Sequence, residues 1–422
     1  MKVLLVGSGG REHAIAAALS RSPKSPELIC APGNPGIAGL ARCFEVSVDD
    51  VPGMVDLARD QGADFVVVGP EAPLVAGLVD ALAEAGIPAF GPSAKAAQLE
   101  GSKAHAKEVM DAAGVPTGAW EKVSEVEAGM AAITGYPVVL KFDGLAAGKG
   151  VVIAQDEATA RATLEAFLIE KRFGEGEVVV EEFLEGEELS LLALCDGERA
   201  IPMASAQDYK RIFDNDEGPN TGGMGSYSPV PGAGADEVAG ISRLVHQPIV
   251  DELARRGTPF HGVLYAGLMM TADGPRVLEY NTRFGDPETQ AVLPRLRRDL
   301  LDLLRRASDP GGLEEAELEW DPRCAVTLVL ASAGYPEDPR LGDEISGLDP
   351  EPVGVEVTYA GVKLEDGVPV TAGGRVLNVT ALGASPAEAR AAAYAGAEEV
   401  RFEGRQMRSD IALRAQERTD DQ

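Results

Sequence analysis

Short apolar runs separated by helical stretches mark the first hundred residues of the chain. Four such runs are present, at residues 3–6, 28–30, 65–68 and 88–90. Runs of this length are typical of buried parallel strands, and the segments 12–19 and 74–85 between them are predicted to be helices. The pattern predicts an open, mostly parallel sheet. Because ligands of such sheets bind beyond the carboxyl ends of the strands, the loops that follow the first three runs are candidate binding segments.

Two further units are predicted downstream, the first entered near residues 114–118 and the second near Leu189. The first has strands at 137–141, 151–153 and 178–182 and a helix at 157–171. The second has a hairpin of strands 262–270 and 276–281 and a helix at 289–307. Between Leu189 and that hairpin lies segment 208–232, which is rich in Gly, Pro, Asn and Asp. Irregular segments of this length inside compact domains are usually functional or disordered.

The last hundred residues are predicted to form a separate unit. The acidic stretch within 309–319 has the composition of a linker. Beyond it, strands are expected at 325–330, 355–359 and 375–380, and an alanine-rich helix at 386–399.

Composition and charge exclude several classes of partner. The chain has 422 residues, of which 45% are hydrophobic and 25% charged, so we expect a globular protein of two to four domains. Its formal net charge of −30 repels nucleic acid and acidic membranes, and we expect neither as a partner. An anionic substrate would therefore need a local basic pocket.

The four cysteines, Cys30, Cys43, Cys195 and Cys324, form no CxxC pair. We therefore expect small core residues in a reducing compartment, with neither a zinc nor a thiol-redox site. No signal peptide and no membrane-spanning run is expected, so a cytoplasmic location is predicted.

The strongest chemical signal is the run from Glu279 to Gln290. Residues i and i+2 of a strand share a face, so Glu279 and Asn281 should project together while Leu278 and Tyr280 point the other way. Two neighbouring hard oxygen ligands suit Mg²⁺, which fills the rest of its shell with phosphate and water. Arg283 adds a planar cation suited to phosphate oxygens.

The first glycine loop, residues 7–12, follows a strand and opens a helix. It fails the dinucleotide fingerprint because Glu12 occupies the place of the third glycine. The loop can still hold a phosphate through backbone N–H groups at the helix start, with Arg11 nearby. The structural alternative is a tight turn needed only for packing. His13 is expected to pack at the helix start, and no Ser-His-Asp arrangement can be argued.

The second glycine loop, residues 144–150, lies between two strands and lacks the spacing and the Ser or Thr of a P-loop. A flap that folds over phosphates, with Lys149 adding charge, fits better. Lys141 at the end of the preceding strand needs an anionic partner if it is buried, and is otherwise a surface lysine.

Two polar segments remain less specific. The acidic run 181–188 ends a strand and could recognise adenine and ribose, or be a solvated face. Lys210 and Arg211, together with the glycine-rich run 218–225, could hold a phosphorylated sugar and a small carboxylate.

Taken together, these motifs resemble the phosphoribosylamine–glycine ligase family, also called glycinamide ribonucleotide synthetases, of the ATP-grasp superfamily. The resemblance runs from Met1 to about residue 415. Its markers are Gly-Gly-Arg-Glu-His-Ala at 9–14, Gly-Pro-Glu-Ala-Pro-Leu at 69–74, Glu-Gly-Ser-Lys at 100–103, Asp-Gly-Leu-Ala-Ala-Gly-Lys-Gly at 143–150, Glu-Glu-Phe-Leu at 181–184, Gly-Pro-Asn-Thr-Gly-Gly-Met-Gly at 218–225 and Arg-Phe-Gly-Asp-Pro-Glu at 283–288.

The resemblance implies an α/β protein with the ATP-grasp fold. It implies an N-terminal substrate domain over 1–100, an ATP-grasp domain over 101–320 with a lid at about 118–188, and a C-terminal α+β domain over 323–422. The implied activity joins 5-phosphoribosylamine to glycine with cleavage of ATP, in purine synthesis, through a glycyl phosphate. Mg²⁺ or Mn²⁺ is the implied metal, and we expect a monomer.

The resemblance also implies roles for individual residues. ATP would contact Lys103, Lys141, Gly144, Gly148, Lys149, Glu181, Leu184 and Glu188. The metal would bind Glu279 and Asn281, and Arg283 with Lys141 would assist phosphoryl transfer. The other substrates would contact Gly9, Gly10, Arg11, Asn34, Glu71, Asp208, Lys210, Arg211, Thr221, Gly222 and Gly223.

Two positions depart from the family pattern: Tyr209, often a histidine, and Phe142, often an alanine. The first leaves a substrate role at 209 open, and the second is read as a packing change. A sister ATP-grasp ligase acting on formate or bicarbonate, and a nucleotide-binding module without turnover, are the alternative functions.

Overall fold

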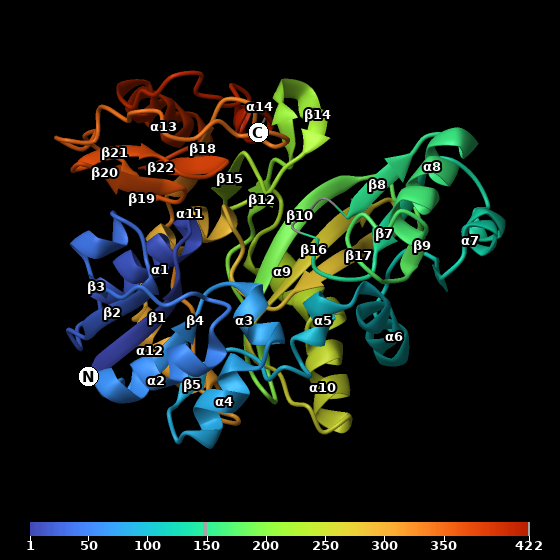
Figure 1. The fold of residues 1–422 in the computed structure, drawn as a ribbon, viewed down its shortest axis with the longest axis horizontal. Coiled ribbons are helices and arrows are strands. Elements are labelled where there is room, and N and C mark those ends of the chain that lie inside the picture. The colour runs from blue at the N-terminus through green and yellow to red at the C-terminus, as the bar shows by residue number, and fades with distance from the viewer. Residues whose placement is uncertain (147–149, 421–422) are drawn as a thin grey trace.

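The computed structural model describes residues 1–146 and 150–420. Its N-terminal sheet is parallel throughout, in the order β3-β2-β1-β4-β5. The strands are β1 (Lys2–Gly7), β2 (Glu27–Pro32), β3 (Arg42–Cys43), β4 (Phe65–Val68) and β5 (Ala89–Phe90). The predicted parallel sheet is confirmed, and Figure 1 shows it in blue.

Helices cover both faces of this sheet, because successive residues of β1 point to opposite sides. Val3 and Leu5 pack in one apolar cluster with α1 (Gly10–Ser20) and α12 (Leu300–Ala307). Leu4 and Val6 pack in another with α2 (Val51–Gln61) and α4 (Leu78–Glu84). At the carboxyl end of the sheet, the loop that leaves β2 contacts the C-terminal domain, because Asn34 donates to the carbonyl of Tyr359.

Two predicted helices are broken. The segment 74–85 divides into α3 (Glu71–Val75) and α4, because Gly77 adopts the left-handed conformation at φ +88°. The segment 289–307 divides into α11 (Glu288–Val292), a 3₁₀ turn (Leu293–Arg295) and α12. Pro294 lacks the N–H that an uninterrupted α-helix would need there.

The middle of the chain forms two antiparallel four-stranded sheets. The lid sheet, in the order β6-β9-β7-β8, contains β6 (Trp120–Val123), β7 (Val138–Phe142), β8 (Val151–Ala154) and β9 (Val178–Glu182). Helices α7 (Val126–Ala132) and α8 (Glu157–Leu168) pack on it around a separate apolar core. Phe142 belongs to that core and contacts the rings of Phe167 and Phe173, in agreement with the predicted packing role.

The second sheet, in the order β11-β10-β16-β17, carries the predicted hairpin. Its strands are β10 (Glu187–Asp196), β11 (Ala200–Pro202), β16 (His261–Thr271) and β17 (Gly274–Asn281). The helices nearby are α5 (Gln98–Gly101), α6 (Lys103–Ala113), α9 (Ala235–Val245) and α10 (Gln247–Arg255). In Figure 1 these central strands run between the lid strands and the two terminal domains.

Segment 208–232 is more regular than its composition predicts. β12 (Gln207–Asp208) and β15 (Gly225–Ser228) join the C-terminal sheet, in the order β12-β15-β18-β22-β19. β13 (Arg211–Phe213) pairs with β14 (Glu217–Asn220). The rest of the C-terminal domain comprises β18 (Cys324–Ala331), β19 (Glu356–Tyr359), β20 (Val362–Glu365), β21 (Val368–Thr371), β22 (Arg375–Gly383), α13 (Pro386–Glu399) and α14 (Leu413–Asp420).

The segment 309–319, predicted as a linker, is packed against the body of the protein. Leu313 is buried, and its N–H donates to the carboxylate of Asp196 at 2.8 Å. The acidic composition of this segment reflects its outer face, whereas its apolar residues fill the cluster beneath α12.

The cysteines are free thiols, and the strand register brings two of them together. Cys30 on β2 is the register partner of Cys43 on β3. Cys30 and Cys195 are buried, whereas Cys43 and Cys324 are partly exposed. Among residues 1–146 and 150–420, no helix is long and apolar enough to cross a membrane.

Candidate active site

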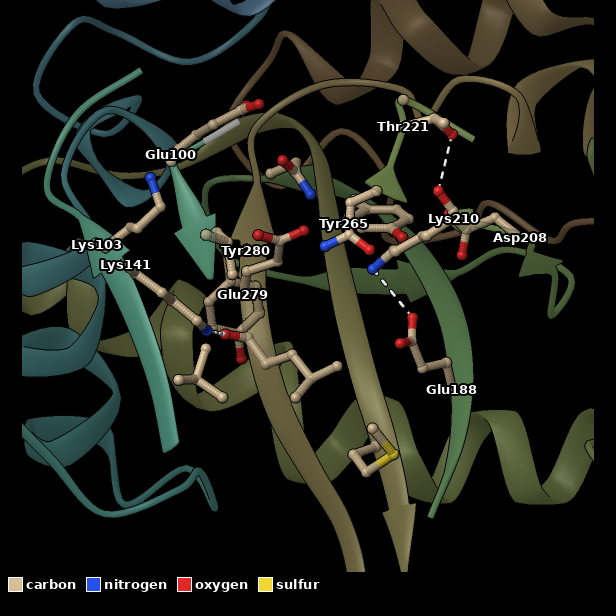
Figure 2. Close-up of a pocket in the computed structure, with 18 of the residues that line it drawn as sticks. Glu100, Lys103, Lys141, Glu188, Asp208, Lys210, Thr221, Tyr265, Glu279 and Tyr280 are labelled. Carbon is tan, nitrogen blue, oxygen red and sulfur yellow. Dashed lines mark hydrogen bonds and ion pairs between the residues drawn. The ribbon is translucent and has the colours of Figure 1, made fainter. Parts of the chain in front are cut away.

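A cavity of about 770 Å³ lies where the lid sheet, the central sheet and the two terminal domains meet. Figure 2 shows Lys103 and Lys141 on one side of it and Asp208, Lys210 and Thr221 on the other, with Glu279 between them. The cavity collects most of the predicted site residues. These are Arg11, Glu71, Lys103, Lys141, Gly144, Glu181, Leu184, Glu188, Asp208, Lys210, Arg211, Thr221, Gly222, Glu279, Asn281 and Arg283.

Four predicted substrate residues do not line this cavity, namely Gly9, Gly10, Asn34 and Gly223. The amide nitrogen of Asn34 donates to the carbonyls of Ser8 and Tyr359, and its oxygen accepts from the N–H of Ile37. Its polar atoms therefore hold the loop together. Gly148 and Lys149 lie outside the described residues.

Local contacts account for the three glycines, and at Gly10 and Gly223 they require glycine itself. The N–H of Gly9 donates to the carboxylate of Glu12 at 2.7 Å, so an acidic side chain already occupies the start of α1. A Cβ on Gly10 would lie 2.2 Å from Nδ2 of Asn378, so this glycine lets the C-terminal domain approach α1. Gly223 has φ +109°, and a Cβ there would lie 2.5 Å from Pro287.

On β17, the side chains alternate as predicted at Glu279, Tyr280 and Asn281 but not at Leu278. Tyr280 also borders the cavity, but its hydroxyl points away from it and donates to the carbonyl of Val245. The β16–β17 register shifts between Gly267 and Leu268, so Leu278 opposes no residue of β16. This β-bulge explains why Leu278 lines the cavity, contrary to the prediction that it points away.

Glu279 is an ionised carboxylate surrounded by cations. Burial raises its pKa, but the ammonium groups of Lys210, Lys141 and Lys103 outweigh burial and lower that pKa below its usual value. Among the described residues, no group of three or more His, Cys, Asp or Glu is arranged to hold a metal ion. The carboxylate of Glu279 and the amide of Asn281 are the hard-oxygen pair that fits a magnesium ion shared with phosphates.

The lid side of the cavity combines two lysines with a buried carboxylate. Nζ of Lys103 donates to the carbonyl of Gly144 at 2.8 Å, and Nζ of Lys141 donates to that of Leu278 at 2.9 Å. The Glu181 carboxylate is paired with Lys141 at 2.6 Å and with Lys107. The two oxygens of Glu181 are thus divided between the two ammonium groups, Oε2 facing Lys141 and Oε1 facing Lys107.

At the N-terminal side, carboxylates and guanidinium groups alternate in a chain. Arg11 lies 3.8 Å from Glu71, and the same oxygen of Glu71 accepts from Nε of Arg283 at 3.3 Å. Burial opposes ionisation of Glu71, yet Arg283 and Arg11 lower its pKa to about 2. Glu100, which the sequence analysis did not single out, pairs with Arg283 at 2.9 Å.

The third part of the cavity is a polar corner on β10, β12 and β16. Lys210 pairs with Glu188 at 3.1 Å, and the carbonyl of Lys210 accepts from the hydroxyl of Thr221 at 2.8 Å (Figure 2). Burial raises the pKa of Asp208 to about 8, although Lys210 opposes that shift. Tyr265 donates to the carboxylate of Glu288 at 2.9 Å in the same corner.

Tyr209, the departure from the family pattern, is tied to the C-terminal domain. Its hydroxyl accepts from the N–H of Ala412 at 2.9 Å, and the Arg408 guanidinium lies over its ring. This contact gives the tyrosine a packing role beside the cavity.

The sequence reasoning missed several cavity residues from distant parts of the chain. From the C-terminal domain, Arg375 donates to the carbonyls of Gly222 and Asp286, and the hydroxyl of Tyr335 accepts from the N–H of Gly222 at 3.0 Å. Neither lies near a recognisable motif. Glu100 and Glu288 do lie within the family motifs at 100–103 and 283–288, and those motifs could have identified them as candidates.

Comparison with family models covers most of the chain. The models match the N domain of phosphoribosylglycinamide synthetase at residues 1–100, its ATP-grasp (A) domain at 101–289 and its C domain at 325–414. The ATP-grasp assignment of the fold is therefore confirmed.

Individual relatives agree with the family models. The chain is 52% identical over 423 residues to phosphoribosylamine–glycine ligase of Streptomyces coelicolor, covering 98% of this chain and 99% of the relative. It is 49% identical to that of Brucella melitensis, covering 99% of both chains.

Solved structures extend the likeness to three dimensions. Phosphoribosylamine–glycine ligase from Thermotoga maritima superposes with a TM-score of 0.83 at 34% identity, covering 97% of this chain and all of the other. The biotin carboxylase domain of 2-oxoglutarate carboxylase from Hydrogenobacter thermophilus shares the fold alone, with a TM-score of 0.72 at 18% identity, covering 96% of this chain and 91% of the other. The chain belongs to the phosphoribosylamine–glycine ligase family of ATP-grasp enzymes.

Proposed function

We propose that this protein joins 5-phosphoribosylamine to glycine, with conversion of ATP to ADP and phosphate, and thereby forms glycinamide ribonucleotide for purine synthesis. The observation that best supports this function is the set of side chains that line one cavity. It combines an acid–amide pair among three lysines with two further polar regions, one near Arg11 and Glu71 and one near Lys210 and Thr221. A nucleotide-binding module without turnover would not need those two regions.

The reaction that fits these residues proceeds through an acyl phosphate. A carboxylate is a poor electrophile at neutral pH, and transfer of the γ-phosphoryl group of ATP to glycine makes it reactive toward an amine. No protein nucleophile is required, so catalysis rests on positioning and charge neutralisation. In this proposal Lys103, Lys141 and Arg283 supply the fixed positive charge.

Each region of the cavity has a proposed substrate. ATP phosphates contact Lys103, Lys141 and the segment that begins at Gly144. Adenine lies near Glu181 and Leu184, with Glu188 available to ribose hydroxyls. The phosphate-bearing amine lies near Arg11 and Glu71, which belong to loops of the N-terminal domain. Glycine lies near Asp208, Lys210, Arg211, Thr221 and Gly222.

A divalent metal fits the pair on β17, where Glu279 and Asn281 are the proposed ligands. Mg²⁺ or Mn²⁺ bound there would neutralise triphosphate charge. The side chains of the protein then have separate tasks: the lysines orient the phosphates, and the lid sheet excludes water that would hydrolyse an acyl phosphate.

We further propose that the protein acts as a monomer in the cytoplasm. Size-exclusion chromatography with light scattering would check the first point, and cell fractionation the second.

A product assay tests the proposal. Purified protein is incubated with MgATP, 5-phosphoribosylamine and glycine, formate or bicarbonate, and both ADP and the coupled product are measured. Only glycine should support stoichiometric formation of ADP and glycinamide ribonucleotide. Equal turnover with formate or bicarbonate would identify a sister ligase, and ATP binding without turnover on any acid would contradict the proposal.

A further inference from the structure

Arg283 is held by four acceptors, two of them its near neighbours in sequence and two from distant parts of the chain. Its Nη2 pairs with Glu100 at 2.9 Å and donates to the amide oxygen of Asn281 at 3.2 Å. Its Nε donates to Glu71 at 3.3 Å, and its Nη1 donates to the carbonyl of Phe284 at 3.2 Å. A guanidinium with these contacts presents one fixed orientation to the cavity.

Glu100 is the best-placed of these acceptors. Its side chain is 7% exposed, against 33% for that of Glu71, and its distance to Arg283 is shorter. An ion pair shielded from water holds its geometry better than a solvated one. Glu71 also shares its oxygen with Arg11, whereas Oε1 of Glu100 faces Arg283.

The second oxygen of Glu100 fixes the backbone next to Arg283. Oε2 accepts from the N–H of Thr282 at 2.7 Å and from its hydroxyl at 3.1 Å. One carboxylate on α5 therefore holds both the main chain at residue 282 and the guanidinium at residue 283. Because both oxygens are engaged, Glu100 is suited to hold Arg283 and poorly suited to bind substrate itself.

The alternative position for Arg283 is close by. The guanidinium already touches Asn281, and the ionised Glu279 lies on the same face of β17. Without Glu100, the attraction to these groups would draw Arg283 onto the proposed metal ligands. An arginine side chain has several rotatable bonds, and Glu71 and the carbonyl of Phe284 hold Nε and Nη1 over longer distances, so loss of Glu100 removes the shortest contact that opposes this movement.

We propose that Glu100 is a positioning residue for phosphoryl transfer: it holds Arg283 at the phosphate side of the cavity and keeps the guanidinium from pairing with the Glu279 carboxylate. This inference rests on the proposed function, in which Arg283 acts on the transferred phosphate.

Glu100→Gln is the direct test. An amide has one acceptor oxygen, so it can serve either Thr282 or Arg283 and must turn its NH₂ group toward the other. We expect kcat to fall by about 10- to 100-fold, which is the range for a misplaced charge-stabilising group, while KM for ATP changes by less than about threefold. Glu100→Asp keeps the charge but withdraws it from Arg283, and should reproduce the loss of kcat if the glutamine variant does not fold.

The matched control is Glu252→Gln on α10. The Glu252 side chain is 5% exposed and accepts from Arg255 and Arg256, so the substitution also breaks two ion pairs of a buried carboxylate, here with arginines at the surface, and none of these residues lines the cavity. This variant should retain wild-type kcat even if its thermal midpoint falls as far as that of Glu100→Gln. A comparable loss of kcat in the control would overturn the inference.

A double-variant cycle separates positioning from direct action. If Glu100 acts through Arg283, adding Glu100→Gln to Arg283→Ala should lower kcat by less than about threefold. A full additional 10- to 100-fold loss, or wild-type kcat in Glu100→Gln alone, would overturn the inference while leaving the proposed function intact. Absence of product from the wild-type protein would instead refute the proposed function.

Discussion

Arg11 and Arg283 donate hydrogen bonds to the same carbonyl oxygen, that of Phe284, over 3.0 and 3.2 Å. One arginine comes from the first helix of the N-terminal domain and the other from the turn after β17. The two proposed sites, for the phosphorylated amine and for the phosphates of ATP, therefore share a backbone anchor. Glu71 strengthens the link, because both arginines pair with it.

Removal of Arg11 should weaken binding of the amine substrate more than binding of ATP. For Arg11→Met we expect KM for 5-phosphoribosylamine to rise about 10- to 100-fold, because a charge-assisted hydrogen bond contributes about 1.5–3 kcal/mol. KM for ATP should change little, since Lys103 and Lys141 remain. Arg21→Met, just beyond the end of α1, is the control. Initial-rate kinetics with each substrate varied in turn would check this, and an equal rise in both KM values would contradict it.

The hydroxyl of Tyr280 is predicted to matter for stability and not for turnover. It lies on the face of β17 opposite Glu279 and donates to the carbonyl of Val245. Tyr280→Phe leaves that buried carbonyl without its partner, which should cost about 1–3 kcal/mol. Urea unfolding would show the loss, and kcat should stay within about twofold of wild type. A large fall in kcat with unchanged stability would contradict the assigned direction of this side chain.

The histidine buried at the start of α1 should make stability depend on pH. Burial lowers the pKa of His13 to about 4, and its Nδ1 accepts from the N–H of Tyr359 at 2.8 Å. Between pH 6.5 and 4 the unfolded chain binds a proton at this site that the folded protein does not, so stability falls as pH falls.

His13→Gln removes that titration while keeping an acceptor. Moving from pH 7.5 to 5.5 should therefore cost the wild-type protein about 1 kcal/mol more than the variant. Urea unfolding of both proteins at the two pH values gives this difference, which isolates His13 from the other titrating groups. Identical pH dependence in the two proteins would show that His13 binds its proton as readily when folded.

Among the thiols, Cys43 is expected to react first with an alkylating reagent near neutral pH. Interaction with the adjacent Cys30 thiol lowers the pKa of Cys43 to about 7. Burial raises the pKa of Cys195 and Cys324, which keeps them as thiols. Peptide mass spectrometry after brief iodoacetamide treatment would measure the order, and Cys30→Ala should slow labelling at Cys43. Modification of Cys195 before Cys43 would contradict the expected order of reactivity.

Local patterns in the sequence predicted functional residues of the cavity well where these residues lie close together in one short segment. The alternation on β17 placed Glu279 and Asn281 together and Tyr280 opposite them. It failed at Leu278, because a β-bulge depends on the register with β16 and leaves no mark in the strand itself. Asn34 shows the same limit, since an amide in a glycine-rich loop can serve the loop as well as a ligand.

Sequence patterns could not predict the contacts between domains. Arg375 and Tyr335 reach Gly222 from the C-terminal domain, and β15 pairs with β18 although a long segment separates them. Composition marked segment 208–232 as irregular because its strands are short, and β15 within it takes a partner, β18, from the C-terminal domain. The broken helices at Gly77 and Pro294 did carry local signals, which the apolar periodicity around them obscured.

The central claim is that Glu279 and Asn281 hold the divalent metal through which ATP activates glycine. Glycine-dependent ADP formation by Glu279→Ala, compared with wild type at saturating MgATP, tests it most directly. Loss of such a charge-stabilising group costs on the order of 3 kcal/mol of barrier, so the rate should fall at least about 100-fold. Tyr280→Phe, on the other face of the same strand, should stay near wild type. Full turnover in Glu279→Ala would contradict the account.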